Sequence, residues 1–339
     1  MKQKFFAVLA LGGLFTFTAG AWDYEGHHAV NQLALASLPS DFGIELTPAL
    51  KGRIAFLAGE PDRWRNIPDL PLKHFNGPDH YIDLEDMKQF DLKPENLPIM
   101  RYDFAAAIAR ARTAHADRFA AIDPAKDSDH TRELDGFLPW AIVENYEKLK
   151  SDFSAFKAFK QYGGTPEEIA NAQADIVYIM GVMGHYVGDG SQPLHTTTHY
   201  NGWVGDNSKG YTTKPTFHAW IDGGYFKKTG GINVDALKGK VQPATRIPKA
   251  GDPEAFFRYI VNYLVEQNQL VEPLYAMEKN GQLSGEGDKG MEGRQLLEGQ
   301  LVKGSQMLGN IWYTAWLEEP EDTYLERQLQ QRNGAAAAK

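Results

Sequence analysis

The sequence of 339 residues contains no cysteine. The protein therefore cannot form disulfides, and any metal ion that it binds must be held by histidine, carboxylate or backbone groups. Basic residues are also in deficit, because 35 lysine and arginine residues face 44 aspartate and glutamate residues and give a formal net charge of −9. Such a charge is not typical of a protein that grips duplex phosphates over a broad basic face, so any nucleic acid would be held locally.

Long apolar runs are scarce as well. The longest, over residues 5–17, follows Lys2 and Lys4 and is followed by Ala-Gly-Ala at 19–21. This order is typical of a secretory signal peptide, so we expect residues 1–21 to be removed and the protein to be secreted or periplasmic. The alternative is a retained membrane anchor, but a run of 13 apolar residues falls short of the roughly 20 that span a bilayer.

Apolar residues recur every three or four positions along most of the chain. This periodicity predicts an all-α protein with helices over 27–38, 48–58, 103–120, 132–160, 166–189, 255–280 and 291–317. Segments rich in glycine, proline and asparagine at about 59–102 and 190–216 predict long loops that line a cleft built on the helices. Because no internal repeat or linker divides the sequence, we expect one multi-helix domain over 22–327, followed by a disordered tail at 328–339.

Two histidine–aspartate pairs share one spacing. His185 and Asp189 lie four residues apart in an expected helix, so their side chains project from the same face and can share a metal ion. His218 and Asp222 repeat this spacing. One such pair alone is at least as common in a structural ion pair, but His195 lies between the two pairs and completes a cluster within 38 residues. The pattern therefore favours metal binding over chance.

Three earlier residues complete a known order. His27 follows Trp22 after four intervening residues, and Asp62 and His80 lie in the expected loop at 59–102. The order Trp-x4-His, Asp, His-aromatic-x-Asp, His-x3-Asp, Gln-Pro-Leu-His, His-x3-Asp over residues 22–222 resembles the superfamily of zinc-dependent phospholipases C and single-strand-specific nucleases. The C-terminal helices match this superfamily only in character.

The resemblance implies a cleft with three zinc ions. The first would be bound by Asp62, His80, His185 and Asp189, the second by His195, His218 and Asp222, and the third by the amine and carbonyl of Trp22 with His27 and a bridging Asp189. It also implies in-line hydrolysis of a phosphodiester, in which a hydroxide held between the first and third ions attacks phosphorus and Asp62 orients it. The second ion would stabilise the charge that develops on the leaving oxygen.

Spacings within the pattern favour the nuclease branch. Four residues separate Trp22 from His27, 22 separate His195 from His218, and the last ligand is Asp222 where the phospholipases typically use glutamate. We therefore expect a zinc-dependent endonuclease that acts on single-stranded DNA or RNA, with no protein partner indicated. A phospholipase C that acts on phospholipid head groups is the first alternative, and a non-catalytic zinc-binding protein is the second.

Three residues fall at substrate-binding positions of the nucleases. Arg65 stands in place of a lysine near the scissile phosphate, and a guanidinium can grip phosphate through two hydrogen bonds. Tyr81 stands in place of a phenylalanine that stacks on a base, which suits unpaired bases, and Asp83 in place of an acid that reads the base edge. The alternatives are a solvated surface charge for Arg65 and a core aromatic for Tyr81. The 17 residues between Asp62 and His80 exceed the nuclease spacing that we expect.

Overall fold

The computed structural model of the protein describes residues 22–337, so the expected signal peptide at 1–21 lies outside the described part. All regular secondary structure in this part is helical, which confirms the prediction of an all-α protein. The α-helices are α1 (Tyr24–Ser37), α2 (Pro48–Leu57), α3 (Glu60–Asn66), α4 (Leu70–Asn76), α5 (Arg101–Ala114), α6 (Leu138–Tyr162), α7 (Pro166–Ser191), α8 (Phe217–Ala219), α9 (Tyr225–Lys228), α10 (Val234–Lys238), α11 (Pro253–Asn268), α12 (Val271–Lys279), α13 (Gly287–Gly290), α14 (Gly293–Glu318) and α15 (Thr323–Ala337). The 3-10 helices are η1 (Gly77–His80), η2 (Asp86–Phe90), η3 (Pro94–Asn96), η4 (Ala116–Arg118), η5 (Pro124–Lys126) and η6 (Pro193–His195), and η7 (Trp220–Gly224) is a π-helix.

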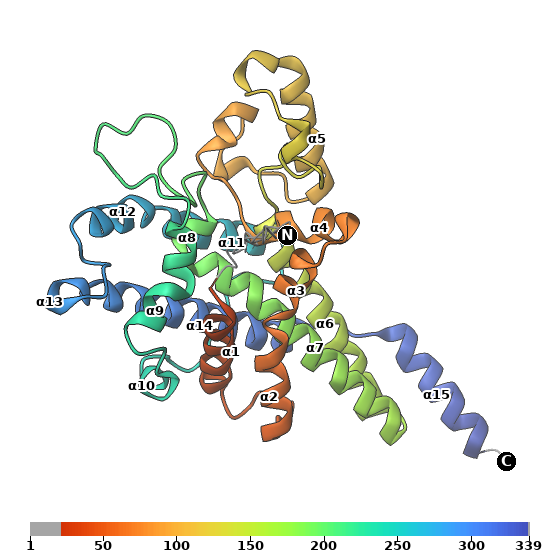
Figure 1. Ribbon diagram of the computed structural model, residues 1–339. Helices are drawn as coiled ribbons and strands as arrows, with labels where there is room; N and C mark the ends of the chain where they lie inside the picture. Colours follow the sequence, from red (N-terminus) through yellow and green to blue (C-terminus); the bar gives the residue numbers. More distant parts are fainter. Residues whose placement is uncertain (1–21, 338–339) are drawn as a thin grey trace, which may run out of the picture.

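Helix α7 lies at the centre of the bundle (Figure 1). It packs against α6, to which a short turn joins it, and against α1, α2 and α14. The large buried side chains of this core include Trp22, Tyr146, Phe153 and Trp312. In residues 22–337 we find no helix whose length and apolar character would let it cross a membrane.

Local sequence explains both the start of α7 and its close neighbours. Thr165 accepts a hydrogen bond from the Glu168 amide, and the Glu168 carboxylate accepts one from the Thr165 amide, which is a capping box. Further along, α1 approaches so closely that a Cβ atom at Gly184 would lie 1.7 Å from Oδ1 of Asn31. A Cβ at Gly188 would lie 3.1 Å from Nδ1 of His27. Glycine at these positions therefore lets α1 bring His27 against α7.

The prediction of a long loop at 59–102 was wrong in part, because α3, α4, η1, η2 and η3 lie in this region. Four of these short elements carry a proline in their first turn, namely Pro61, Pro71, Pro78 and Pro94. Proline is favourable there because the first amides of a helix have no partner within it. The same prolines that indicate a loop in the sequence thus begin short helices.

The other predicted helices match the structure to within about three residues at each end, but three predicted helices differ more. The helix predicted at 103–120 is α5, which ends at Ala114, and the one predicted at 132–160 begins only at Leu138. The helix predicted at 255–280 is divided into α11 and α12 by Gln269 and Leu270.

The prediction of a disordered tail from residue 328 was wrong over residues 328–337, which belong to α15. Alanine has the highest helix propensity, and α15 is also tied to the α6–α7 turn. Arg332 donates to the Glu168 carboxylate at 2.8 Å, and Asn333 donates to the carbonyl of Tyr162 at 2.8 Å. Leu329 is buried. These contacts link the C-terminal helix to the central pair.

Candidate metal centre

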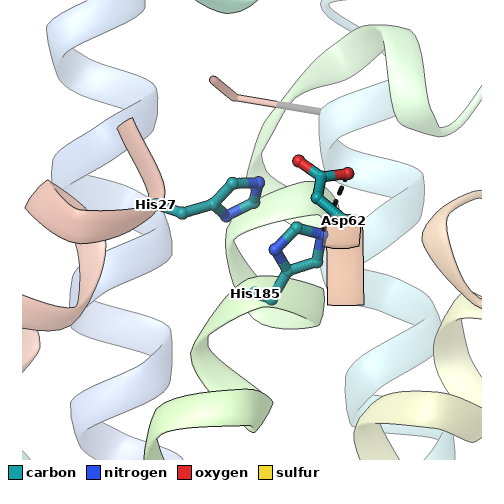
Figure 2. Close-up of side chains that lie close together, drawn as sticks. All are labelled: His27, Asp62 and His185. Atoms are coloured by element: carbon teal, nitrogen blue, oxygen red, sulfur yellow. Dashed lines mark ion pairs between the residues drawn. The ribbon is translucent and has the colours of Figure 1, made fainter. Parts of the chain in front are cut away.

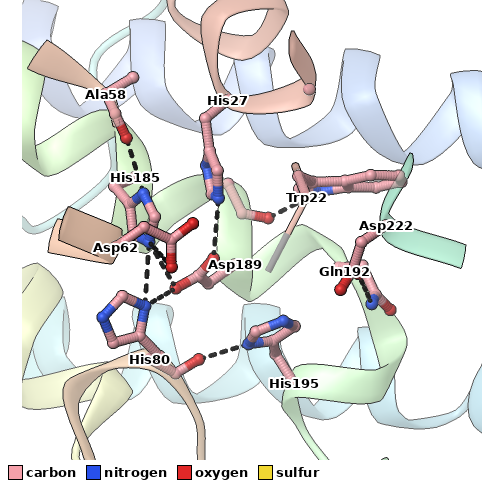
Figure 3. Close-up of polar contacts among 12 residues, drawn as sticks. Trp22, His27, Ala58, Asp62, His80, His185, Asp189, Gln192, His195 and Asp222 are labelled. Atoms are coloured by element: carbon pink, nitrogen blue, oxygen red, sulfur yellow. Dashed lines mark hydrogen bonds and ion pairs between the residues drawn. The ribbon is translucent and has the colours of Figure 1, made fainter. Parts of the chain in front are cut away.

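The side chains predicted to bind zinc come from seven helical elements and lie close together, and Figure 3 shows all of them except His218. They are His27 on α1, Asp62 on α3, His80 on η1, His185 and Asp189 on α7, His195 on η6, His218 on α8 and Asp222 on η7. All are buried except Asp62, whose side chain is 17% exposed. We call these eight side chains the His/Asp cluster.

Asp189 lies at the centre of one half of this cluster. Its Oδ1 is 3.4 Å from Nε2 of His27, and its Oδ2 is 3.0 Å from Nδ1 of His80 and 3.4 Å from Nε2 of His185. The rings of His27 and His185 are stacked with centroids 3.8 Å apart, and Asp62 approaches His185 from the side (Figure 2). One carboxylate therefore faces three imidazoles.

The second half consists of His195, His218 and Asp222. Nε2 of His218 lies 3.0 Å from Nε2 of His195 and 2.9 Å from Oδ2 of Asp222. Asp222 belongs to the π-helix η7, a rare geometry that occurs frequently at functional sites. Its Oδ1 accepts a hydrogen bond of 2.6 Å from the side-chain amide of Gln192.

The hydrogen bonds around two of the histidines fix which nitrogen faces the cluster. Nδ1 of His185 lies 2.7 Å from the carbonyl of Ala58, and Nδ1 of His195 lies 2.6 Å from the carbonyl of His80. Because a carbonyl only accepts, each Nδ1 must donate, and in the neutral ring Nε2 then carries a lone pair. A backbone acceptor behind the ring is the usual support of a histidine that binds metal.

Two carboxylate oxygens complete this set of lone pairs. Oδ1 of Asp189 and Oδ2 of Asp222 are buried, and each faces the Nε2 of a histidine, at 3.4 Å from His27 and 2.9 Å from His218. A buried carboxylate is costly unless it is paired or binds a metal ion. The donor set of imidazole nitrogen and carboxylate oxygen is one that zinc accepts, so the residues present fit a zinc site.

Burial also sets the protonation of the cluster. It lowers the pKa of His185 to about 3 and lowers the pKa of His80 and His195 well below the usual range. It raises the pKa of Asp189 and Asp222, because a carboxylate loses its hydration there. The three imidazoles are therefore neutral near pH 7, which is the form that binds metal.

The cluster divides into three groups whose ligand atoms all lie within 4.8 Å of one another. These groups are His80 with His185 and Asp189, His195 with His218 and Asp222, and His27 with Asp62 and His185. The second group is the predicted second site. The first matches the predicted first site without Asp62, which groups instead with His27. Such groups could hold metal ions.

Trp22 lies beside both halves of the cluster. Its indole donates to the carbonyl of Gly188 and to the hydroxyl of Ser191, both at 3.1 Å. The amide of the next residue, Asp23, donates to the carbonyl of Asp222 at 3.1 Å. The main chain at residues 22 and 23 thus passes between α7 and η7, while a role of the Trp22 amine as a ligand stays a prediction.

A cavity of about 460 Å³ opens beside the His/Asp cluster, with His80, His195 and His218 in its wall. The three residues predicted to bind substrate also line it, namely Arg65, Tyr81 and Asp83. Nε of Arg65 donates to Oδ1 of Asp62 at 2.8 Å, so this guanidinium is not a solvated surface charge. Tyr81 is half-buried, and its hydroxyl donates to the carbonyl of Leu134 at 3.4 Å.

Other residues also line this cavity. Lys126 and Arg132 come from the segment before α6 and were not predicted, whereas Tyr200 lies in the segment at 190–216 that was predicted to line a cleft. Gln192 belongs to the Gln-Pro-Leu-His motif, but its hydrogen bond to Asp222 was not predicted. The cations at 126 and 132 lie far from the motif and gave no signal.

A scan against models of known protein families finds no match for this chain, and a search of curated proteins finds none either. The assignment of a function therefore depends on the His/Asp cluster and the cavity beside it.

Proposed function

We propose that the protein is a zinc-dependent phosphodiesterase that cleaves single-stranded DNA or RNA. The observation that carries this proposal is that the His/Asp cluster borders a cavity whose wall contains both basic and aromatic side chains. Basic side chains attract the negative charge of a phosphodiester, and an unpaired base can stack on an aromatic ring.

Three zinc ions are the occupants that we propose for the cluster. Nitrogen and oxygen ligands without sulfur suit zinc, and Asp189 has two oxygens that face different histidines and can bridge two ions. Zinc held there would act as a Lewis acid and lower the pKa of bound water, which is the chemistry that phosphodiester hydrolysis requires.

The protein's own residues would position the reactants. Asp62 is the most exposed side chain of the cluster, and its contact with Arg65 holds the carboxylate in place. It can accept a hydrogen bond from the attacking water, while the positive charge of Arg65 would attract a phosphate oxygen. The preorganised positive charge would then stabilise the transition state.

The walls of the cavity favour a nucleic acid over phosphatidylcholine. Arg65, Lys126 and Arg132 are basic, and they would attract phosphate but repel the quaternary ammonium of a choline head group. Tyr81 and Tyr200 offer two ring faces for unpaired bases. A duplex would keep its bases inside the stack, so single strands are the substrate class that fits.

The purified, zinc-loaded protein should be assayed on single-stranded DNA, RNA and phosphatidylcholine. We expect internal cleavage of the two nucleic acids and no release of the choline phosphate. Hydrolysis of phosphatidylcholine alone would instead show a phospholipase C. A protein that binds zinc but hydrolyses none of the three would be a non-catalytic zinc-binding protein.

We further propose that the protein is exported and cleaved after Ala21. The Trp22 amine cannot bind a metal ion while Ala21 acylates it, so full activity of a protein that retains residues before Trp22 would contradict the third zinc site. Mass spectrometry of the protein from its native cell gives the N-terminus directly.

A further inference from the structure

A second group of carboxylates lies outside the His/Asp cluster. Oxygens of Asp83, Asp86 and Asp135 all lie within 4.8 Å of one another. Asp83 follows η1, Asp86 begins η2, and Asp135 precedes α6, so two distant parts of the chain contribute. The amide of Asp83 donates to the carbonyl of Asp135 at 2.9 Å, which holds the two segments together.

Two of these aspartates have a carboxylate oxygen that is buried and has no donor within residues 22–337. Asp135 is 6% exposed, and its Oδ2 accepts no hydrogen bond from residues 22–337. Oδ1 of Asp83 is also buried and has no donor within the same residues. The neighbouring Glu85 shows the contrast, because its carboxylate accepts hydrogen bonds from Thr197 and Asn268, both at 2.8 Å. Asp83 and Asp135 thus each keep a buried carboxylate oxygen that no donor within residues 22–337 reaches, close to the carboxylate of Asp86.

Nearby positive charge does not offset the cost of burying these carboxylates. Burial and the charges of Asp86 and Glu85 raise the pKa of Asp135 to about 8, although Arg112 acts in the opposite direction. Arg112 itself donates to the carbonyl of Glu133 at 3.0 Å and lies over the ring of Phe119. Gln89 donates to Oδ1 of Asp86 at 2.8 Å and contributes no charge.

We propose that Asp83, Asp86 and Asp135 bind a calcium ion at a site separate from the His/Asp cluster. Their ligand atoms are all oxygens, which hard cations prefer, and the group offers no imidazole to zinc. Magnesium usually takes one or two carboxylates and keeps several waters, whereas three carboxylates on irregular segments suit the larger and more flexible shell of calcium. Asp86 and Asp135 also line a cavity of about 400 Å³, which gives an ion a way in.

The ion would tie together two segments that line the cavity beside the His/Asp cluster. Tyr81 and Asp83 belong to one segment, and Thr131 and Leu134, just before Asp135, belong to the other. Calcium would therefore order the place where substrate is proposed to bind without touching the zinc ligands.

To test the proposal, the zinc-loaded protein is prepared in calcium-free buffer and then titrated with calcium. Calorimetry measures the binding, and thermal unfolding measures the change in Tm. We expect one site per chain with a Kd on the order of 0.1–1 mM. The Tm should then rise by about 2–4 °C in excess calcium. Magnesium should bind about tenfold or more weakly.

Asp135→Asn should abolish both the heat of binding and the rise in Tm, while Asp117→Asn, on the exposed 3-10 helix η4, should keep both. Asp86→Asn is a second variant for the case in which Asp135→Asn does not fold, and it should also lose calcium binding. The absence of any calcium effect on the wild-type protein would overturn the proposal. A full calcium effect in Asp135→Asn or Asp86→Asn would also overturn it, as would tighter binding of magnesium than of calcium. None of these measurements uses hydrolysis, so the calcium site and the proposed function stand or fall separately.

Discussion

Asp189 connects most of the His/Asp cluster through a single carboxylate. Its two oxygens face His27 on one side and His80 and His185 on the other. Because burial raises the pKa of Asp189 well above its usual range, the metal-free protein holds a proton at this carboxyl group more readily than at an exposed aspartate. A metal ion needs the carboxylate, so the ion and the proton compete for the same group.

Zinc binding to the metal-free protein should therefore release protons from the buried carboxyl groups. His80, His185 and His195 should contribute none near pH 7, because their low pKa values leave these rings neutral already. Zinc affinity should consequently rise with pH. Calorimetry in buffers with different ionisation enthalpies measures the release, and Asp189→Asn should release fewer protons. A heat that does not depend on the buffer would show that Asp189 is not a ligand.

Substitution of Tyr81 distinguishes an effect on substrate binding from an effect on metal binding. Tyr81→Ala should weaken the binding of single-stranded substrates by about 1–3 kcal/mol through the loss of stacking. Hydrolysis of bis-nitrophenyl phosphate should change little, and zinc content should not change. Tyr81→Phe keeps the ring and loses only the hydroxyl contact with Leu134, so it should resemble the wild type. Equal losses on both substrates in Tyr81→Ala would indicate a structural role instead.

At the scale of elements, α7 carries the site because α1 can approach it. The carboxamide of Asn31 donates to the carbonyls of Ile54 and Gly181 at 2.9 and 3.0 Å, and so joins α1, α2 and α7 about two turns before Asp189. Gly184 faces this carboxamide directly. The fit leaves no room for a methyl group.

Gly184→Ala should therefore lower the free energy of unfolding by about 1–3 kcal/mol or more, because the new Cβ atom would displace Asn31. Gly299→Ala is a matched control on α14, since a Cβ at Gly299 meets nothing within 4 Å. It should raise stability by roughly 0.5–1 kcal/mol through helix propensity. Urea unfolding of the zinc-free proteins provides both values. Equal stability of the two variants would contradict the close packing of α1 and α7.

The elements that the sequence predicts best are those with local signals. The capping box at Thr165 and the four-residue spacing of His185 and Asp189 depend only on neighbours along the chain, and both features occur in α7. His218 and Asp222 also come together, as their spacing predicts. They lie on a three-residue α-helix and a π-helix, however, and the i to i+4 spacing alone does not distinguish these geometries from a regular α-helix.

Contacts between distant segments could not be predicted in this way. Asp135 lies 52 residues from Asp83, and only the pairing of their backbones brings the two carboxylates together. The hydrogen bonds of Ala58 and Gln192 to the cluster likewise depend on how α2 and η6 pack. The sequence therefore indicates the ligands of the candidate metal centre better than it indicates the residues that support them.

The whole molecule is acidic, with a net charge of −9, while the cavity beside the His/Asp cluster is lined by Arg65, Lys126 and Arg132. Contacts with phosphate should consequently be few and local. For three phosphate contacts on a single strand, the logarithm of the binding constant should fall with the logarithm of salt concentration at a slope of about −2. Titration of a catalytically inactive zinc-bound variant with a labelled oligonucleotide at several salt concentrations checks this value. A slope of about −6 or steeper would indicate a broad basic surface that this account does not contain.

The central claim is that the His/Asp cluster holds zinc, and the most direct test is the zinc content of the purified protein by elemental mass spectrometry. The wild-type protein should contain about three zinc ions per chain, and Asp189→Ala should lose at least two of them together with all hydrolysis of phosphodiesters. Asp175→Ala, an exposed position on the same helix, should keep the full zinc content. A wild-type protein that takes up no zinc, or an Asp189→Ala protein that keeps as much as the wild type, would contradict the account.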